Sequence, residues 1–187
     1  MELPRRGEVP IARFAVQFNA SPKPVATGFQ QAWASKPQVS CDGQAMFAEI
    51  AVLSLFQKEG WDGVWVDAQR RRYFSRMPTL SKGVTLDAYV AQLLARVASA
   101  GGGSGAASWE LILWHGRSVF FAAVRDASSL AEGGPLLRKG ELAWLESALR
   151  SGLAPQQFVV VEWSYRRVVV ERRRPKAGGG PARLVTP

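Results

Sequence analysis

The sequence predicts a single α/β domain in which a core sheet is flanked by helices. Three segments are short, apolar and rich in aromatic or β-branched residues, as strands are: WELILW (109–114), VFFAAVR (119–125) and FVVVEW (158–163). Longer segments with helical spacing of apolar residues precede the first of these strands and separate the last two. The chain has 187 residues, 47% of them hydrophobic, which is enough to bury one core.

The first part of the chain is predicted to contribute a strand and a helix. Residues 11–20 (IARFAVQFNA) alternate in the manner of an edge strand. Residues 21–42 are irregular, and a helix is expected from about Gln44 to Glu59 with Asp42 as its cap. Glu49 lies beside the apolar stripe of this helix, so its carboxylate is expected on the buried side, either in a site or at the edge of the core. The stripe consists of Met46, Ile50, Leu53 and Phe56.

A strand and then a cluster of arginines are expected after this helix. Residues 60–69 indicate a turn and the first core strand, with Asp62 in the turn and Asp67 at the end of the strand. The segment RRRYFSRM (70–77) interleaves basic and aromatic side chains. Guanidinium groups bind phosphates and aromatic rings stack on bases, so the pattern suits a nucleic acid, although an amphipathic strand edge has the same pattern. The candidate contact residues are Arg70, Arg71, Arg72, Tyr73 and Arg76.

A second helix, from about Thr85 to Ala100, is predicted next. It ends in GGGSG (101–105), which is a flexible linker and lacks the Lys-Ser/Thr pair of a phosphate-binding loop. Residues 70–108 are therefore expected to form a largely helical insertion between the first and second core strands.

The hairpin of the second and third core strands has a predictable register. A two-residue loop at Gly116-Arg117 and a four-residue loop at 115–118 give the same pairing, with Ile112 opposite Phe121 and Glu110 opposite Ala123. Because side chains alternate between the faces of a strand, Glu110, Ala123 and Arg125 are expected on one face. An acid and an arginine are thus predicted to lie close together near the end of an apolar hairpin.

The last part of the domain is predicted to be a helix and a buried strand. Pro135 suits the first turn of a helix and Gly152 the position after its end, so the helix is expected from about Pro135 to Ser151. Glu141 falls on the apolar stripe of this helix and is expected to be buried. Residues 158–163 are almost continuously apolar, as in a strand that is covered on both faces.

The order of these elements resembles the core of the PD-(D/E)xK nuclease superfamily, in particular its VRR-type and Holliday-junction-resolvase-like branch. The resemblance covers about residues 46–163, within a core of about 44–163, and implies a restriction-endonuclease-like α-β-β-β-α-β fold with a mixed sheet. Glu110 takes the position of the strand acid, and Ala123, Val124 and Arg125 take those of the E-x-K motif. Glu141 stands where the family has a glutamine, and "VEW" at 161–163 matches a late family strand.

The resemblance implies a Mg²⁺-dependent phosphodiesterase site, with the metal held by Glu49, Glu110 and the Val124 carbonyl. The catalytic positions are Glu49, Glu110, Arg125 and Glu141. Because the central acid is replaced by Ala123, Mg²⁺ is expected to bind weakly, at a relocated site, or not at all. An arginine stays protonated, so Arg125 cannot act as a base. Arg125 is expected either to hold a phosphate or to pair with Glu110 or Glu141.

The charge of the chain favours a polyanionic partner. The net charge is +9, and four of these nine charges belong to residues 171–187, a Pro/Gly-rich segment with the composition of a disordered tail. This tail follows a domain of residues 1–170 and contains Arg172, Arg173 and Arg174, which are expected either to contact DNA or to aid solubility.

Other features point to a cytoplasmic protein without a membrane segment. No stretch is long and apolar enough to span a bilayer, the first ten residues lack the apolar core of a signal peptide, and Cys41 is the only cysteine. The single histidine, His115, lies in the hairpin turn and is expected to be exposed to solvent and not catalytic. Resolvase-like proteins often work as dimers, so the resemblance also implies a possible homodimer.

Three functions follow as hypotheses. The first is a nuclease-superfamily protein that binds nucleic acid, DNA in the first instance, with cleavage lost or reduced because the E-x-K motif reads Ala123-Val124-Arg125. The second is an active divalent-metal-dependent DNA endonuclease that uses Glu49, Glu110 and Glu141. The third is a structural or protein-interaction module that reuses the fold.

Overall fold

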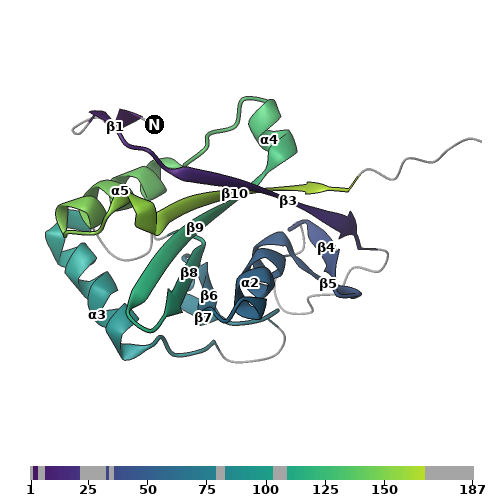
Figure 1. Cartoon of the computed structure of the whole chain (residues 1–187), viewed down its shortest axis with the longest axis horizontal. Coiled ribbons are helices and arrows are strands. Elements are labelled where there is room, and N and C mark those ends of the chain that lie inside the picture. The colour runs from purple at the N-terminus through teal and green to yellow at the C-terminus, as the bar shows by residue number, and fades with distance from the viewer. Residues whose placement is uncertain are drawn as a thin grey trace, which may run out of the picture.

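The computed structural model describes residues 2–3, 7–21, 33, 36–78, 83–102 and 109–166. Within them the protein is an α/β structure built on an eight-stranded mixed sheet with helices on both faces (Figure 1). The strands of this sheet, in spatial order, are β5 (Gln44–Phe47), β4 (Gln38–Cys41), β3 (Ala12–Ala20), β10 (Phe158–Tyr165), β9 (Ser118–Asp126), β8 (Leu111–His115), β6 (Asp62–Asp67) and β7 (Arg72–Phe74).

The remaining elements are helices and one small hairpin. The helices are α2 (Ala48–Lys58), α3 (Ala88–Val97), α4 (Ala127–Ala131) and α5 (Lys139–Arg150), with a π-helical turn at Ala98–Gly102 and a 3₁₀ turn at Pro155–Gln157. The strands β1 (Glu2–Leu3) and β2 (Gly7–Glu8) form a separate antiparallel pair. No helix in the described part of the chain is long and apolar enough to cross a membrane.

The central strands run in mixed directions. β8 is antiparallel to both of its neighbours, β6 and β9, whereas β10 is parallel to both β9 and β3. The predicted hairpin register is confirmed, since Ile112 lies opposite Phe121 and His115 opposite Ser118 across the turn at Gly116. The positive φ of Gly116, 57°, suits the tight turns that join antiparallel strands.

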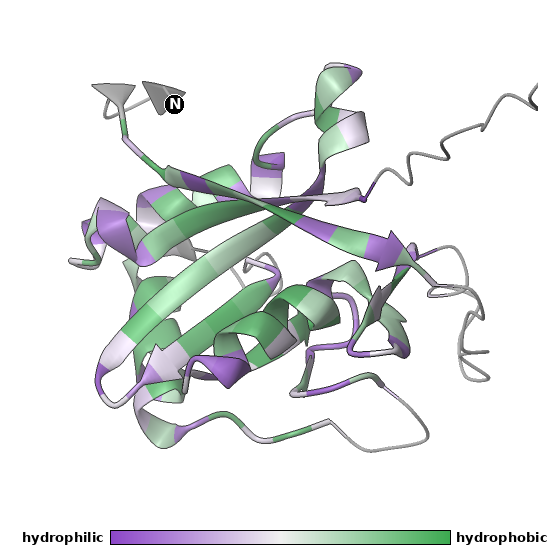
Figure 2. Cartoon of the chain, turned by 45° about the vertical axis from the view of Figure 1, so that its right-hand side comes forward, coloured by the Kyte–Doolittle hydropathy of each residue, from purple (hydrophilic) through white to green (hydrophobic). Residues whose placement is uncertain are grey.

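Two hydrophobic cores lie on the two faces of the sheet. One is covered by α3 and α5 and contains Trp109, Phe121 and Phe158, and the other is covered by α2 and contains Leu111 and Val161. Successive residues of β10 alternate between the two cores, which confirms the prediction of a strand that is buried on both faces. Figure 2 shows the apolar colour running along β9 and α2 in the middle of the molecule.

Gly63 allows α2 to approach the sheet closely. A Cβ at this position would lie 2.7 Å from side-chain carbons of both Leu53 in α2 and Leu113 in β8. No real side chain tolerates such contacts without movement of its neighbours. The close approach packs α2 against β6 and β8, and Glu49 lies in the first turn of this helix.

The predicted helix at 44–59 is wrong in its first turn. Residues Gln44–Phe47 form β5, and the helix begins at Ala48. Asp42 does not cap the helix, since it lies with Gly43 in the turn between β4 and β5 and has a φ of 51°. An Asp-Gly pair favours a hairpin turn in which both residues have positive φ, and here that preference prevails over helix capping.

Three other predictions need smaller corrections. The helix expected at 135–151 begins only at Lys139, and the helix expected at 85–100 is regular from Ala88 to Val97, where Asp87 accepts hydrogen bonds from the Tyr89 and Val90 N–H groups. The strand at 11–20 is present as β3, but it lies within the sheet order, next to β10. β7 and α3 do lie between β6 and β8 in the chain, as an insertion should.

Candidate functional site

An acid cluster lies at one end of the central strands. Glu110 directly precedes β8, and its carbonyl accepts a hydrogen bond of 2.8 Å from the Val66 N–H, which keeps it in line beside β6. Arg125 lies near the end of β9, next to Glu110, and Glu141 lies in the first turn of α5. All three side chains are buried. The apolar stripe of α5 predicts this burial for Glu141, and the alternation of the hairpin predicts that Glu110 and Arg125 share one face.

The guanidinium group of Arg125 lies at the centre of this cluster. Its Nη1 donates to Glu110 Oε2 at 2.7 Å and to the Val124 carbonyl at 2.9 Å. Its Nη2 donates to Glu141 Oε2, and its Nε donates to the Leu136 carbonyl at 2.9 Å. The Arg125 side chain is 7% exposed. Its nitrogen atoms are therefore all engaged by the protein, and none is presented to solvent as a phosphate clamp.

Both carboxylate oxygens of Glu110 also have partners within the protein. Its Oε2 also accepts the Val124 N–H at 2.7 Å, and its Oε1 pairs with Nη1 of Arg138 at 2.9 Å. Glu141 accepts the Arg138 backbone N–H at 2.6 Å, which satisfies a free donor at the start of α5. An acid in the first helical turn also interacts favourably with the helix dipole.

Burial and mutual attraction both shift the pKa values of Glu110 and Arg125. Burial raises the pKa of Glu110 because it disfavours the charged carboxylate, whereas Arg125 and Arg138 oppose that rise. Burial alone would lower the pKa of Arg125, but Glu110 and Glu141 together raise it above its ordinary value. Arg125 is therefore a permanent cation between the two carboxylates.

The raised pKa of Glu110 predicts how stability depends on pH. An acid whose pKa is higher in the folded than in the unfolded state contributes most below its ordinary pKa, and this contribution is lost as the pH rises through the folded-state pKa. We expect Glu110→Gln to flatten the decline in unfolding free energy above about pH 4.5, measured by urea denaturation at several pH values. A decline as steep as in the wild type would contradict this assignment.

The residues at the implied metal site do not fit a divalent cation. Nη1 of Arg125 bonds to both the Glu110 carboxylate and the Val124 carbonyl, the two oxygen ligands that the resemblance implies on the strands. The third implied ligand, Glu49, forms an ion pair with Lys36. Ala123 is fully buried in the apolar core that α3 and α5 cover. Among the described residues, no group of three or more His, Cys, Asp and Glu side chains is arranged to hold a metal ion.

The arginine cluster after β6 divides into two parts. Arg70 is engaged, since it pairs with Asp67 at 3.1 Å and lies 5.3 Å from the Trp33 ring centre. Arg71, Arg72 and Arg76 are exposed, and none of them forms an ion pair with another described residue. Tyr73 is half-buried and packs on the core, so its ring is not a free stacking surface. Arg172, Arg173 and Arg174 lie outside the described residues.

Asp62, Asp67 and His115 lie at the ends of β6 and β8, and His115 is exposed, as expected. Asp67 ends β6, as predicted, and is buried beside Arg70, whereas Asp62 is the exposed first residue of β6 and not part of the turn. A ring nitrogen of His115 lies 3.0 Å from the Gly60 carbonyl. His115 ends β8 at the opposite end from Glu110.

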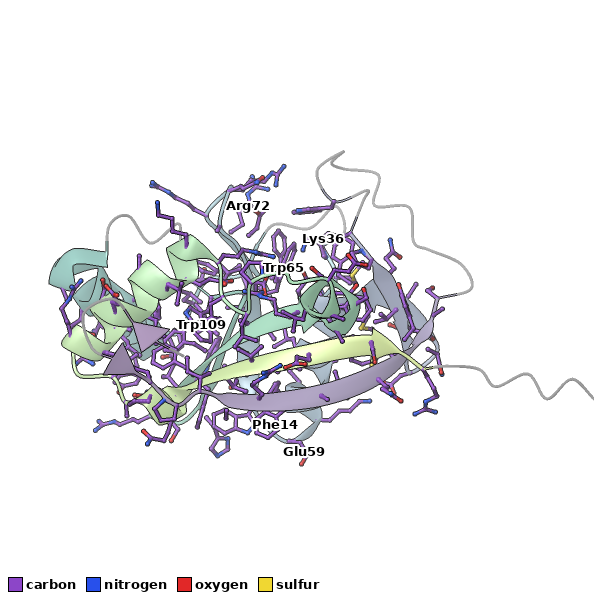
Figure 3. All side chains as sticks on the ribbon, turned by 90° about the horizontal axis from the view of Figure 1, so that it is seen from above. Phe14, Lys36, Glu59, Trp65, Arg72 and Trp109 are labelled. Atoms are coloured by element: carbon purple, nitrogen blue, oxygen red, sulfur yellow. The ribbon has the colours of Figure 1, made fainter. Side chains whose placement is uncertain are left out.

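Two site residues were missed by sequence reasoning. Lys36 lies in a segment without periodicity, so nothing in the sequence assigns it to Glu49. Arg138 precedes α5, and a basic residue three positions before Glu141 is a weak signal for contact with an acid cluster. Figure 3 shows Lys36 and Arg72 on one side of the molecule, with the Trp65 ring in the same region.

Comparisons of the chain with protein-family models, with curated proteins and with solved structures found no match. The defining feature of the site is an arginine that occupies the space between two buried carboxylates and a strand carbonyl.

Proposed function

We propose that this protein is a nucleic-acid-binding member of the PD-(D/E)xK nuclease superfamily that has lost phosphodiesterase activity. The chain order of α2, β6, β8, β9, α5 and β10 supports the proposal, because it is the α-β-β-β-α-β order that the resemblance implies. The single observation that carries the loss of cleavage is the position of Arg125, whose guanidinium group bonds to Glu110, Glu141 and the Val124 carbonyl.

A guanidinium group cannot replace the chemistry of a metal ion in such a site. Metal-assisted hydrolysis requires a cation that polarises the phosphoryl oxygen and generates hydroxide from water. Arg125 supplies positive charge but has no open coordination position and does not release its proton near neutral pH. Glu110 and Glu141 are both engaged in ion pairs, so neither carboxylate is free to act as a general base.

The surface that best suits the nucleic-acid backbone lies along β7, the last strand of the sheet. Arg71, Arg72, Tyr73, Gly83 and Val84 line a polar cavity of about 300 Å³. The Val84 N–H bonds to the Tyr73 carbonyl at 2.8 Å, and a Cβ on Gly83 would lie 2.9 Å from that carbonyl oxygen. The segment at Gly83 and Val84 thus packs closely against β7, and Arg71 and Arg72 lie beside the hollow.

The backbone at Arg71 also favours a functional interpretation. Its φ is 53°, a left-handed conformation that is uncommon for a residue with a large side chain. This conformation turns the chain from β6 into β7, where Arg71 and Arg72 are both exposed and line the same hollow. Guanidinium groups that share a hollow, and that form no ion pair with the described residues, are well suited to phosphate oxygens.

DNA binding should depend on these arginines and on salt. For Arg71→Ala/Arg72→Ala we expect weaker binding to single-stranded, duplex and branched DNA. The salt slope for duplex DNA should become shallower by about 0.9 for each phosphate that the variant no longer neutralises. Fluorescence anisotropy with labelled oligonucleotides at several salt concentrations measures both quantities. The matched control is Arg96→Ala/Arg117→Ala, which removes the same charge from two other exposed arginines.

The outcomes separate the binding surface from the tail. Equal weakening in the two double variants would show a general effect of charge and contradict the β7 assignment. If a variant that lacks residues 171–187 binds no DNA, the tail carries binding and the folded surface does not. If the wild type binds no DNA at all, the proposed function fails.

An interaction module remains the second candidate function, because one observation favours it. Phe14 is 58% exposed on β3, on the side of the molecule away from Arg72 (Figure 3). Phe14 also lines two largely apolar hollows together with Phe56, and a contiguous exposed apolar patch of this kind is typical of a surface that another protein covers.

A further inference from the structure

The outer edge of β3 has no strand partner over most of its length. β3 pairs with β10 from Ala12 to Phe18, but on its other side β4 reaches only Asn19 and Ala20. Among the described residues, no strand pairs with the outer edge between Ala12 and Phe18. An open edge presents unpaired N–H and C=O groups, which are a template for another strand.

Alternate residues of β3 direct their backbone N–H and C=O groups toward β10 and toward the open edge. The Phe18 carbonyl accepts a hydrogen bond from the Arg166 N–H at 2.7 Å, so Phe18 faces the β10 side, whereas Asn19 faces β4. Backbone groups alternate in direction along a strand, so Arg13, Ala15 and Gln17 present their N–H and C=O groups outward.

The edge lacks the features that usually prevent strand pairing. Natural edge strands carry proline, lysine, bulges or inward-pointing charges. β3 contains no proline or lysine, and its single charged residue, Arg13, is turned to Glu162 on β10 at 2.5 Å. The four residues from Ala12 to Ala15 are all exposed.

Beside this edge, the face covered by α2 has one projecting ring and two hollows. The ring is that of Phe14, and the hollows have volumes of about 250 and 310 Å³. Phe14 and Phe56 line both, and the larger hollow is also lined by Val16. The linings are almost entirely apolar, so water there is readily displaced by an apolar side chain.

We propose that two copies of this chain pair antiparallel through the outer edges of β3, with the two-fold axis at Ala15. In this register Ala15 lies opposite Ala15 of the second copy, and Arg13 lies opposite Gln17, so the outward backbone groups of each copy meet those of the other. Arg13 is not placed opposite itself, which avoids repulsion between like charges.

The same register brings the Phe14 ring into the interface. Phe14 of each copy lies opposite Val16 of the other, on the face that α2 covers, and therefore beside the larger apolar hollow. A closed two-fold interface of this kind is self-complementary and joins the two sheets into one. The pairing involves neither the Arg125 cluster nor β7, so it is independent of the proposed function.

The oligomeric state tests the proposal first. Sedimentation equilibrium of the wild type over a range of concentrations is expected to show a monomer–dimer equilibrium. Phe14→Glu should remove the apolar contact, and Ala15→Pro should remove an outward N–H without disturbing the pairing with β10, so both should weaken dimerisation by about tenfold or more. Tyr89→Glu, which adds the same charge at another exposed aromatic residue, is the control and should dimerise as the wild type does.

Cysteine cross-linking tests the register. Residues that are directly opposite in an antiparallel pair have Cα atoms about 5.5 Å apart, within the range of a disulfide. Under oxidising conditions Ala15→Cys should give a covalent dimer, whereas Arg13→Cys, whose two copies lie far apart in this register, should not. Each variant is made in a Cys41→Ser background, and thermal unfolding confirms that it folds.

Several results would overturn the proposal. A monomer at all concentrations excludes it, and so does a dimer that both Phe14→Glu and Ala15→Pro leave intact. Cross-linking through Arg13→Cys and not Ala15→Cys rejects the register. If the wild type is monomeric and removal of residues 167–187 produces the dimer, that segment of the same chain occupies the edge.

Discussion

Replacement of Arg125 by alanine should destabilise the protein by about 3–5 kcal/mol, the loss typical of removing one partner from a buried ion pair. The variant leaves the buried carboxylates of Glu110 and Glu141 without their shared cation, and it frees the Val124 and Leu136 carbonyls. Burial already raises the pKa of Glu110, and loss of Arg125 should raise it further. The destabilisation should therefore be smaller in acid, where the carboxyl group is neutral.

Urea denaturation of the wild type and Arg125→Ala at neutral and acidic pH measures this effect. Arg138→Ala is the matched control, because its side chain also pairs with Glu110 but is 65% exposed, and it should cost less than about 1 kcal/mol. Adding Glu110→Gln and Glu141→Gln to Arg125→Ala should recover part of the lost unfolding free energy, because the two buried carboxylates are then replaced by neutral amides. A loss below about 1 kcal/mol for Arg125→Ala would mean that the cluster is not the tight ion-pair network described above.

Arg125→Ala should also bind divalent cations more tightly than the wild type does. Removing the guanidinium group leaves the Glu110 and Glu141 carboxylates and the Val124 carbonyl around the vacated space, and Mg²⁺ and Mn²⁺ prefer such oxygen ligands. A cation that binds only the folded state stabilises it, by about 2.7 kcal/mol at a hundred times the dissociation constant.

Thermal unfolding with increasing Mn²⁺ tests this gain. The melting temperature of Arg125→Ala should rise as Mn²⁺ is added, by an increment that saturates once the site is filled. The melting temperatures of the wild type and Arg138→Ala should not change. Addition of Glu110→Gln to Arg125→Ala should abolish the response. If Arg125→Ala is indifferent to Mn²⁺ although it folds, the position of Arg125 is not equivalent to a lost metal site.

Periodicity predicted the parts of the site that lie on regular elements. The two-residue alternation of the hairpin placed Glu110 and Arg125 on one face, and the helical stripe placed Glu141 in the core. These inferences succeed because burial imposes the period of the element on the side chains. The sequence left open whether Arg125 binds phosphate or carboxylates, because that choice depends on the rotamer and on the distance between β9 and α5.

Residues outside regular elements were harder to predict. Lys36 and Arg138 lie in irregular segments that precede β4 and α5, and only the fold brings them to Glu49 and Glu110. The β4–β5 hairpin was missed because Asp42 suits a helix cap as well as a turn. The Asp42-Gly43 pair was the signal for the turn, and the adjacent apolar stripe obscured it.

Under the proposed function, Arg125 takes the place of the metal ion of a nuclease site, and the protein still binds nucleic acid. The most direct test is calorimetric titration of the wild type with Mn²⁺, alongside cleavage assays on single-stranded, duplex and branched DNA. The expected result is no saturable binding of Mn²⁺ and no cleavage, together with DNA binding that weakens as salt increases. Saturable Mn²⁺ binding with DNA cleavage, both lost in Glu110→Ala, would contradict the claim and establish an active nuclease.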